Sequence, residues 1–163
     1  MASHMEQQIS APARVQAALT AAGVDARIEE FPSSTRTAQE AADTVGTSVA
    51  QIVKSLVFLA GDAPVVALVS GVNRLDTERL ATLAGATIGK ADADAVRQAT
   101  GYSIGGVPPI GFPAPLPTFI DRDLLQYDVV WAAAGTPRHV FPIAPTELVR
   151  ITGGTVAELR LSG

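Results

Sequence analysis

Two neighbouring apolar segments in the middle of the chain constrain the fold most strongly. Residues 53–60 and 64–70 are rich in Val, Leu and Phe, which are favoured in strands, and they flank Gly61-Asp62. A short glycine-containing link between two such segments is typical of a β-hairpin. We therefore predict an antiparallel hairpin at the centre of a β-sheet.

Capping and stop signals predict short helices around this hairpin. Ser10 and Gly23 bracket the first helix, and Thr37 with Glu40 forms a capping box ahead of a helix that stops at Gly46. The helices are predicted at 10–22, 37–46, a shorter one from Ser48, 77–84, 92–100 and 145–150. Further strands are predicted at 26–31, 118–121, 128–133 and 139–143. The mixture indicates an α/β fold with at least partly antiparallel pairing.

The segment 101–117 combines glycines and prolines and is predicted to be an ordered loop. Its prolines at 108, 109, 113, 115 and 117 exclude a regular helix or a central strand. Glycines let backbone N–H groups approach a ligand, so the loop could present fixed donors to a carbonyl or a phosphate. Neither a phosphate-binding Walker loop nor a dinucleotide-binding glycine motif is present. A crossing loop without a ligand remains an equal alternative.

Length and composition fit one domain without cysteine chemistry. The chain has 163 residues, of which 47% are hydrophobic, and this excludes a disordered chain. No apolar stretch approaches the roughly 18 residues of a membrane span. Without cysteine, a disulfide, a thiolate zinc site and a cysteine nucleophile are excluded. No signal-peptide pattern opens the chain, so a cytoplasmic location is the default expectation. We expect no cofactor and no membrane partner.

The first five residues resemble a cloning scar, and we assign residues 6–163 to a single domain. His139 is then the only native histidine, so a histidine-rich metal site is not expected. The formal charge of −4 argues against an extended nucleic-acid interface, because such binding requires many Lys and Arg residues. A small nucleic-acid footprint remains open.

Lys54 is the first candidate for a functional side chain. It begins the strand predicted at 53–60 and shares a face with Ile52, Leu56 and Phe58, which we expect to be buried. Desolvation lowers the pKa of a lysine, so this residue could bind a ligand or act in catalysis. Alternatively, its stem packs while its ammonium group reaches water. The chain has ten arginines and only two lysines, which slightly favours a functional role.

Other polar residues give weaker signals. Ser33, Ser34 and Thr35 precede a helix, where hydroxyls are common in turns, and capping explains Thr37 fully. A lone strand histidine such as His139 is more often structural than catalytic. Asp121 and Asp123 more often form a solvated edge than an acid–base pair. No Ser-His-Asp triad is indicated.

Four sequence blocks together resemble the YbaK and prolyl-tRNA synthetase editing-domain family. They are Arg36-Thr37-Ala38, residues 51–58 with Lys54, residues 71–76, and the loop GYSIGGVPPIG from Gly101 to Gly111. The resemblance runs from about residue 10 to about residue 152 and is closest to the free-standing members. It implies a mixed, strongly curved, barrel-like β-sheet surrounded by helices.

The family resemblance implies an aminoacyl-tRNA deacylase that hydrolyses the ester of a mischarged tRNA in trans. The expected amino acid is small, such as Cys, Ala, Ser or Thr, and the expected tRNA is tRNA-Pro or a related one. A ribose hydroxyl of the terminal adenosine would help to activate water, while the protein positions the ester and polarises its carbonyl.

The resemblance also implies roles for individual residues. Lys54 would anchor the terminal nucleotide or the aminoacyl group, and backbone N–H groups around Gly105 and Gly106 would bind the ester carbonyl. The expected substrate-binding residues are Thr35, Thr37, Ser55, Asn73, Pro109, Gly135 and His139. The turn at residues 135–139 differs from that of cysteine-specific members, so the amino acid stays open.

The expected partner is the 3′ acceptor end of a tRNA, contacted over a small footprint. Weak intrinsic affinity would suggest recruitment by an aminoacyl-tRNA synthetase or an elongation factor. Two alternatives to the hydrolase remain: a non-catalytic module that binds an amino acid, a nucleotide or a tRNA end, and an adaptor that docks on a synthetase.

Overall fold

The computed structural model describes residues 9–33 and 37–162. The α-helices are α2 (Ala11–Ala21), α3 (Ala38–Val45), α4 (Thr77–Ala84), α5 (Ala93–Thr100) and α6 (Pro145–Thr152), and the 3-10 helices are η1 (Val49–Gln51) and η2 (Arg122–Gln126). The strands are β1 (Glu29–Glu30), β2 (Val53–Ala60), β3 (Ala63–Ser70), β4 (Ile88–Lys90), β5 (Thr118–Asp121), β6 (Val130–Ala133), β7 (His139–Ile143) and β8 (Thr155–Ala157).

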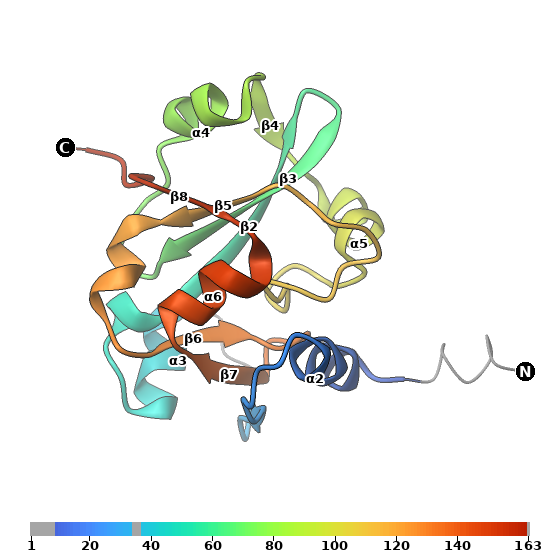
Figure 1. Ribbon diagram of the computed structural model, residues 1–163, viewed down its shortest axis with the longest axis vertical. Helices are drawn as coiled ribbons and strands as arrows, with labels where there is room; N and C mark the ends of the chain where they lie inside the picture. Colours follow the sequence, from blue (N-terminus) through green and yellow to red (C-terminus); the bar gives the residue numbers. More distant parts are fainter. Residues whose placement is uncertain (1–8, 34–36, 163) are drawn as a thin grey trace, which may run out of the picture.

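The predicted hairpin forms the centre of a five-stranded mixed sheet with the order β4-β2-β3-β5-β8. Strands β2 and β3 pair antiparallel along their whole length, from Val53 opposite Ser70 to Ala60 opposite Ala63. Strand β5 joins β3 in parallel, and β8 joins β5 in parallel. Figure 1 shows this sheet in the upper part of the molecule, with α4 and β4 at its top.

The remaining strands form a separate three-stranded sheet with the order β1-β7-β6, in which all pairs are antiparallel. A single parallel bridge between Ile52 and Trp131 links this sheet to the start of β2. The barrel-like sheet predicted from the family resemblance is therefore wrong. A closed barrel needs continuous strand pairing around its circumference, and one isolated bridge does not close the gap between two open sheets.

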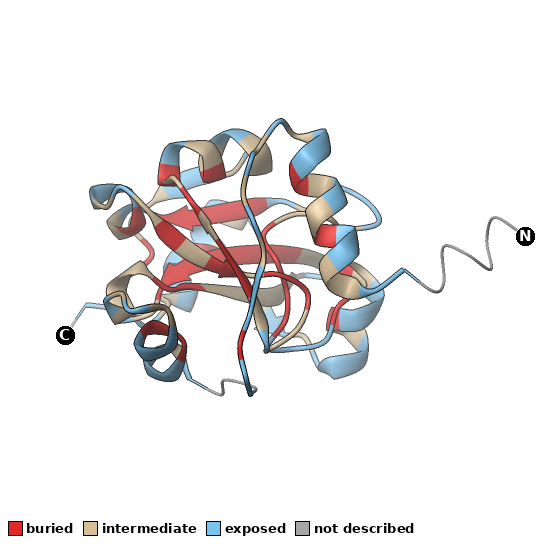
Figure 2. Ribbon diagram, turned by 90° about the horizontal axis from the view of Figure 1, so that it is seen from below, coloured by how far each residue is buried: buried red, intermediate tan, exposed pale blue. Residues whose placement is uncertain are grey.

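Apolar side chains from both sheets and from the helices form the core. Val15 and Leu19 of α2 join buried residues of β3, β6 and β7 in the largest cluster, whereas Leu80 of α4 packs on the other face of the five-stranded sheet with Val65 and Phe119. Figure 2 shows burial concentrated on the central strands and exposed residues on the outer faces of the helices. The core thus holds both sheets in place around the site described below.

Most predicted elements are confirmed, and the differences lie in short segments. Thr37 caps α3 as predicted, Asp76 and Asp92 cap α4 and α5, and residues 101–117 contain no helix or strand. The strand predicted at 26–31 is reduced to β1, while β4, β8 and η2 were not predicted. Strands of two or three residues are too short to show an alternating pattern. Their pairing depends on the neighbouring strand, so the sequence of the segment alone does not predict them.

In the described ranges, the chain contains no helix that is both long and apolar enough to cross a membrane.

Candidate functional site

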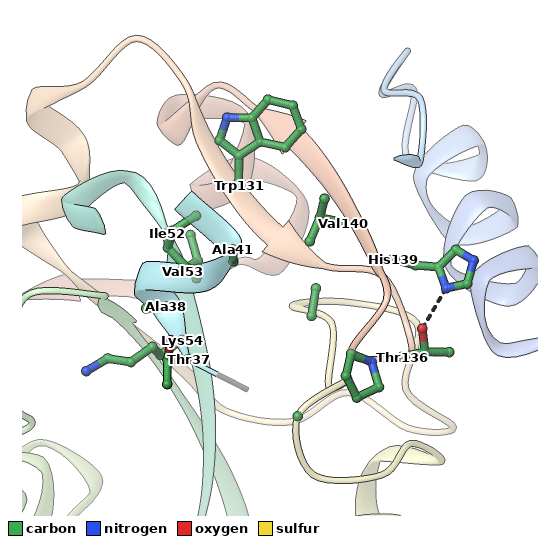
Figure 3. Close-up of a pocket in the computed structure, with 13 residues that line it drawn as sticks. Thr37, Ala38, Ala41, Ile52, Val53, Lys54, Trp131, Thr136, His139 and Val140 are labelled. Atoms are coloured by element: carbon green, nitrogen blue, oxygen red, sulfur yellow. Dashed lines mark hydrogen bonds between the residues drawn. The ribbon is translucent and has the colours of Figure 1, made fainter. Parts of the chain in front are cut away.

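A pocket of about 160 Å³ opens between the start of β2, the beginning of α3 and the three-stranded sheet. Gly105 closes another side. The turn between β6 and β7, which carries Thr136 and His139, lies opposite Lys54 (Figure 3). The walls are mostly apolar, with a few polar side chains at the margins. The lining residues are Thr37, Ala38, Ala41, Ile52, Val53, Lys54, Gly105, Trp131, Ala133, Thr136, Pro137, His139 and Val140.

Lys54 is held at the margin of this pocket by a main-chain carbonyl. Its ammonium Nζ donates a hydrogen bond of 2.5 Å to the carbonyl oxygen of Asn73. Burial lowers the pKa of Lys54, the charge of Asp121 raises it, and Arg74 lowers it. The ammonium group is therefore partly desolvated and held by this carbonyl, and its role as a substrate anchor stays a prediction.

The expectation that the Lys54 face of the strand is the buried one is only partly correct. Ile52 is buried, whereas Leu56 and Phe58 are half-buried and pack against the smaller cluster around Leu80. Val53, on the opposite face, enters the main core and is 5% exposed.

Thr37 combines a capping contact with a place in the pocket wall. Its Oγ1 accepts a hydrogen bond of 3.1 Å from the backbone N–H of Glu40, which is the predicted N-cap interaction of α3. The start of this helix thereby brings Ala38 and Ala41 into the pocket wall. Thr35, the other predicted threonine, lies outside the described residues, as do Arg36 and the first five residues.

The glycine loop places Gly105 and Gly106 in different roles. Gly105 lines the pocket in a left-handed conformation with φ of 94°. The Gly106 N–H donates to the Ser103 carbonyl at 3.0 Å, and its contact with an ester carbonyl stays a prediction. A Cβ at Gly106 would lie 2.6 Å from the Cα of Thr136, which makes glycine a packing requirement there.

The turn from Gly135 to His139 closes the pocket opposite Lys54. A Cβ at Gly135 would lie 2.8 Å from the carbonyl carbon of Ala11, so this glycine allows the turn to contact α2. The imidazole Nδ1 of His139 lies 2.6 Å from the hydroxyl of Thr136, and its Nε2 lies 3.8 Å from a carboxylate oxygen of Glu30 on β1. In Figure 3 the ring of His139 points away from Lys54 and toward α2.

Four of the predicted substrate-binding residues that the structure describes do not line this pocket: Gly135, which supports the turn, and Ser55, Pro109 and Asn73. Ser55 lines a second pocket of about 140 Å³ on the other side of Gly105, and its buried hydroxyl has no hydrogen-bond partner among the described residues. Pro109 lines a third pocket beside α6. Asn73 is 6% exposed, and its side-chain amide donates to Asp121 and Asp123. Their contact with a substrate stays a prediction.

Sequence reasoning missed the walls contributed by Trp131, Thr136 and Val140. Trp131 is the only tryptophan of the chain. Nothing in the sequence around it indicates that it would pair with Ile52 at the start of β2. Thr136 lies next to the predicted Gly135, so the turn was identified but its hydroxyl was not. Between residues 9 and 162, outside the undescribed gap at 34–36, no cluster of His, Cys, Asp or Glu is placed to hold a metal ion.

Comparison with known proteins identifies the family of the chain. The family model of the aminoacyl-tRNA editing domain matches residues 32–151. The chain is 30% identical to the "Uncharacterized protein YwhH" of Bacillus subtilis, over 74% of this chain and 78% of that protein. It is also 30% identical to the "Putative Cys-tRNA(Pro)/Cys-tRNA(Cys) deacylase EbsC" of Enterococcus faecalis, over 75% of this chain and 76% of that protein.

A solved structure described as "a putative trans-editing enzyme for prolyl tRNA synthetase" is similar over nearly the whole chain. The two share 48% sequence identity with a TM-score of 0.90, covering 93% of this chain and 98% of the other. The family model and this fold agree with the resemblance carried by Lys54 and the glycine loop. The chain belongs to the aminoacyl-tRNA editing-domain family.

Proposed function

We propose that this protein is a trans-editing hydrolase that deacylates mischarged tRNA. One observation carries the proposal: in a chain of the editing-domain family, the Lys54 ammonium is fixed at the margin of a pocket bounded by Gly105. The relatives named as a deacylase and as a trans-editing enzyme support the same activity. The reaction adds water across the aminoacyl ester and yields a free amino acid and a free ribose hydroxyl.

The described side chains favour positioning over covalent catalysis. Lys54 presents a cation at one margin of the pocket, and Thr37, Thr136 and His139 line other margins. The ammonium group would anchor the terminal nucleotide or the aminoacyl group, and the Gly105 region would face the ester carbonyl. Holding the ester against a ribose hydroxyl that activates water lowers the barrier through orientation and charge stabilisation.

The pocket walls favour a small aminoacyl group. Ala38, Ala41 and Val140 contribute short apolar side chains, and the volume is about 160 Å³. Cys, Ala, Ser and Thr are therefore the candidate amino acids. An apolar pocket alone separates side chains that differ by one methylene by only about 10- to 200-fold, so the polar margin must add to the discrimination.

The proposed partner is the acceptor end of a tRNA, with tRNA-Pro or a related tRNA as the first candidate. The name of the solved relative, which refers to prolyl tRNA synthetase, supports this choice. A synthetase or an elongation factor would deliver the substrate, since the net charge of −4 does not favour strong binding of tRNA alone. This role places the protein in the cytoplasm, with no membrane partner.

Release of amino acid from a panel of charged tRNAs tests this function directly. The panel contains tRNA-Pro charged with Cys, Ala, Ser, Thr and Pro, and the same amino acids on their own tRNAs. We expect multiple-turnover release of one or more small amino acids and much slower release of Pro. Binding without release would support the non-catalytic module, and binding to a synthetase alone would support the adaptor.

A further inference from the structure

A buried aspartate lies behind the loop that holds Lys54. Asp121 ends β5 and is 1% exposed. Its Oδ2 accepts hydrogen bonds from the backbone N–H of Ser70 at 3.0 Å and from the Asn73 side chain at 2.8 Å, and its Oδ1 accepts from the backbone N–H of Asp123 at 3.0 Å. Burying a carboxylate costs free energy unless hydrogen-bond donors compensate it, and these three donors satisfy both oxygens of Asp121.

Asn73 connects this carboxylate to Lys54. Its side-chain amide donates to Asp121 and to Asp123, both at 2.8 Å, while its main-chain carbonyl accepts the hydrogen bond from the Lys54 ammonium. In the described part of the chain, Lys54 makes no direct ion pair with either aspartate. The connection from Asp121 to Lys54 therefore runs through one residue of the loop that follows β3.

We propose that Asp121 is the positioning residue for Lys54 and acts through Asn73. The side chain of Lys54 has a flexible four-carbon stem, so its ammonium needs an external constraint to stay at the pocket margin. Asp121 holds the Asn73 amide, which fixes the carbonyl that receives the ammonium. Fixing a charged group before the substrate arrives removes an ordering cost from the reaction.

The charge of Asp121 supports the same role. Burial and Arg74 both lower the pKa of Lys54, and Asp121 is the group that opposes them. Asp123 accepts from the same Asn73 amide, but its charge is not among the causes of the Lys54 pKa shift. The effects of the two aspartates on Lys54 can therefore be distinguished by experiment.

Three variants distinguish the positioning role from general stability. Asp121→Asn removes the charge and leaves at least one of the three donors without its acceptor. Asn73→Ala keeps the charge and the main-chain carbonyl but releases the loop from Asp121. Asp123→Asn is the matched control, because it removes the other carboxylate that accepts a hydrogen bond from the Asn73 side-chain amide. Thermal melts establish that each variant is folded, and Asn73→Ala decides the question should Asp121→Asn fail to fold.

The direct readout is nuclear magnetic resonance of the two lysines, which needs no tRNA. With ¹³C-labelled lysine, only Lys54 and Lys90 contribute Cε signals, and exposed Lys90 is the internal reference. We expect Asp121→Asn to lower the pKa of Lys54 and its Cε order parameter, and Asn73→Ala to lower the order parameter. Asp123→Asn should change both quantities less, and Lys90 should titrate alike in all proteins. An unchanged Lys54 signal in folded Asp121→Asn or Asn73→Ala would overturn the proposal.

The activity readout rests on the proposed function and uses the best substrate of the panel. Misplacing an anchor by about 1 Å can cost up to about 10²-fold in rate, so we expect Asp121→Asn and Asn73→Ala to lower kcat by about tenfold or more, with a smaller change in KM. Equal kcat losses in Asp121→Asn and Asp123→Asn would overturn the assignment to Asp121. Failure of the wild-type protein to release any amino acid would overturn the proposed function, while the lysine signals would still decide the positioning role.

Discussion

The backbone N–H of Gly135 donates a hydrogen bond of 2.9 Å to the carbonyl oxygen of Gly106. This contact joins the proline-rich loop to the turn between β6 and β7, two segments that are separated along the chain. Both segments contribute to the pocket, through Gly105 on one side and through Thr136 and His139 on the other. The shape of the pocket therefore depends on how closely the two loops approach.

Gly106→Ala should disrupt this approach. The added Cβ would lie 2.6 Å from the Cα of Thr136, and backbone atoms cannot move aside cheaply, so we expect a loss of about 1–3 kcal/mol in the free energy of unfolding and reduced deacylation. Gly105→Ala is the matched comparison. Its Cβ would meet Pro137 at 3.5 Å, so its cost comes mainly from the positive φ of 94° and should be about 1 kcal/mol. Urea unfolding of both variants checks this order, and equal losses would contradict it.

Lys54→Ala should nearly abolish deacylation while the protein stays folded, because it removes the anchor and also relieves the desolvation of a partly buried charge. Lys54→Arg should restore activity only in part, since a planar guanidinium group does not occupy the space of a compact ammonium group. Single-turnover hydrolysis of a charged tRNA measures both effects, with circular dichroism melts as the folding control.

The second lysine of the chain provides the matched control for that experiment. Lys90 lies on edge strand β4, is exposed and does not line the pocket, so Lys90→Ala should leave the single-turnover rate unchanged. A wild-type rate in Lys54→Ala would show that its ammonium is not an anchor and that Lys54 has only a packing role.

Ser55→Ala should leave the protein as stable or make it more stable. The hydroxyl is buried without a partner among the described residues, so its removal eliminates a desolvation cost of about 1–3 kcal/mol that no hydrogen bond offsets. Ser70→Ala is the contrast, because the Ser70 hydroxyl donates to the Ala50 carbonyl at 2.7 Å and its loss should cost about 1 kcal/mol.

Urea unfolding of both serine variants tests this difference, and a similar loss in Ser55→Ala would show that its hydroxyl is hydrogen-bonded in solution. Deacylation by Ser55→Ala separately tests the predicted contact with substrate. We expect the wild-type kcat/KM, because Ser55 lines the second pocket rather than the pocket with Lys54 and its hydroxyl is buried. A reduced kcat/KM would instead support the contact with substrate predicted from the sequence.

The salt dependence of tRNA binding should be shallow. A footprint limited to the acceptor end neutralises few phosphates, so log affinity should fall with log salt at a slope near −1 to −3, given about 0.7 to 0.9 per contact. Binding of charged minihelix and of full-length tRNA, measured from low to moderate salt, checks this value. A slope near −10, or a much steeper slope for the full-length tRNA, would indicate an extended interface.

Elements controlled by nearby residues could be predicted from the sequence. The α4 helix begins at its Asp76 cap and ends at Gly85, and the hairpin forms from two apolar strands around a glycine turn. These features depend on interactions within a few residues, so their signals are local. The four sequence blocks likewise identified the editing-domain family, which the family model and the relatives confirm.

Partners of individual polar groups were decided by the tertiary structure. The sequence placed Gly106 in a ligand-binding loop, but in the structure its N–H donates a hydrogen bond to the carbonyl oxygen of Ser103. It placed Ser55 beside Lys54, but alternation along β2 and the position of Gly105 put the two side chains in different pockets. A hydrogen bond or a pocket wall requires atoms to meet within a few ångströms, and residue type alone does not specify which groups will meet.

By itself, the sequence determined the central hairpin, the capped helices, the irregular loop at 101–117 and the family. The tertiary structure alone decided that the strands form two open sheets rather than a barrel. It also decided that Asp121, 67 positions beyond Lys54 in the sequence, is connected to Lys54 by the hydrogen bonds of Asn73. Caps and turns arise from local backbone preferences. Sheet closure and buried polar contacts arise from packing between distant segments, whose geometry is settled only when the whole core forms.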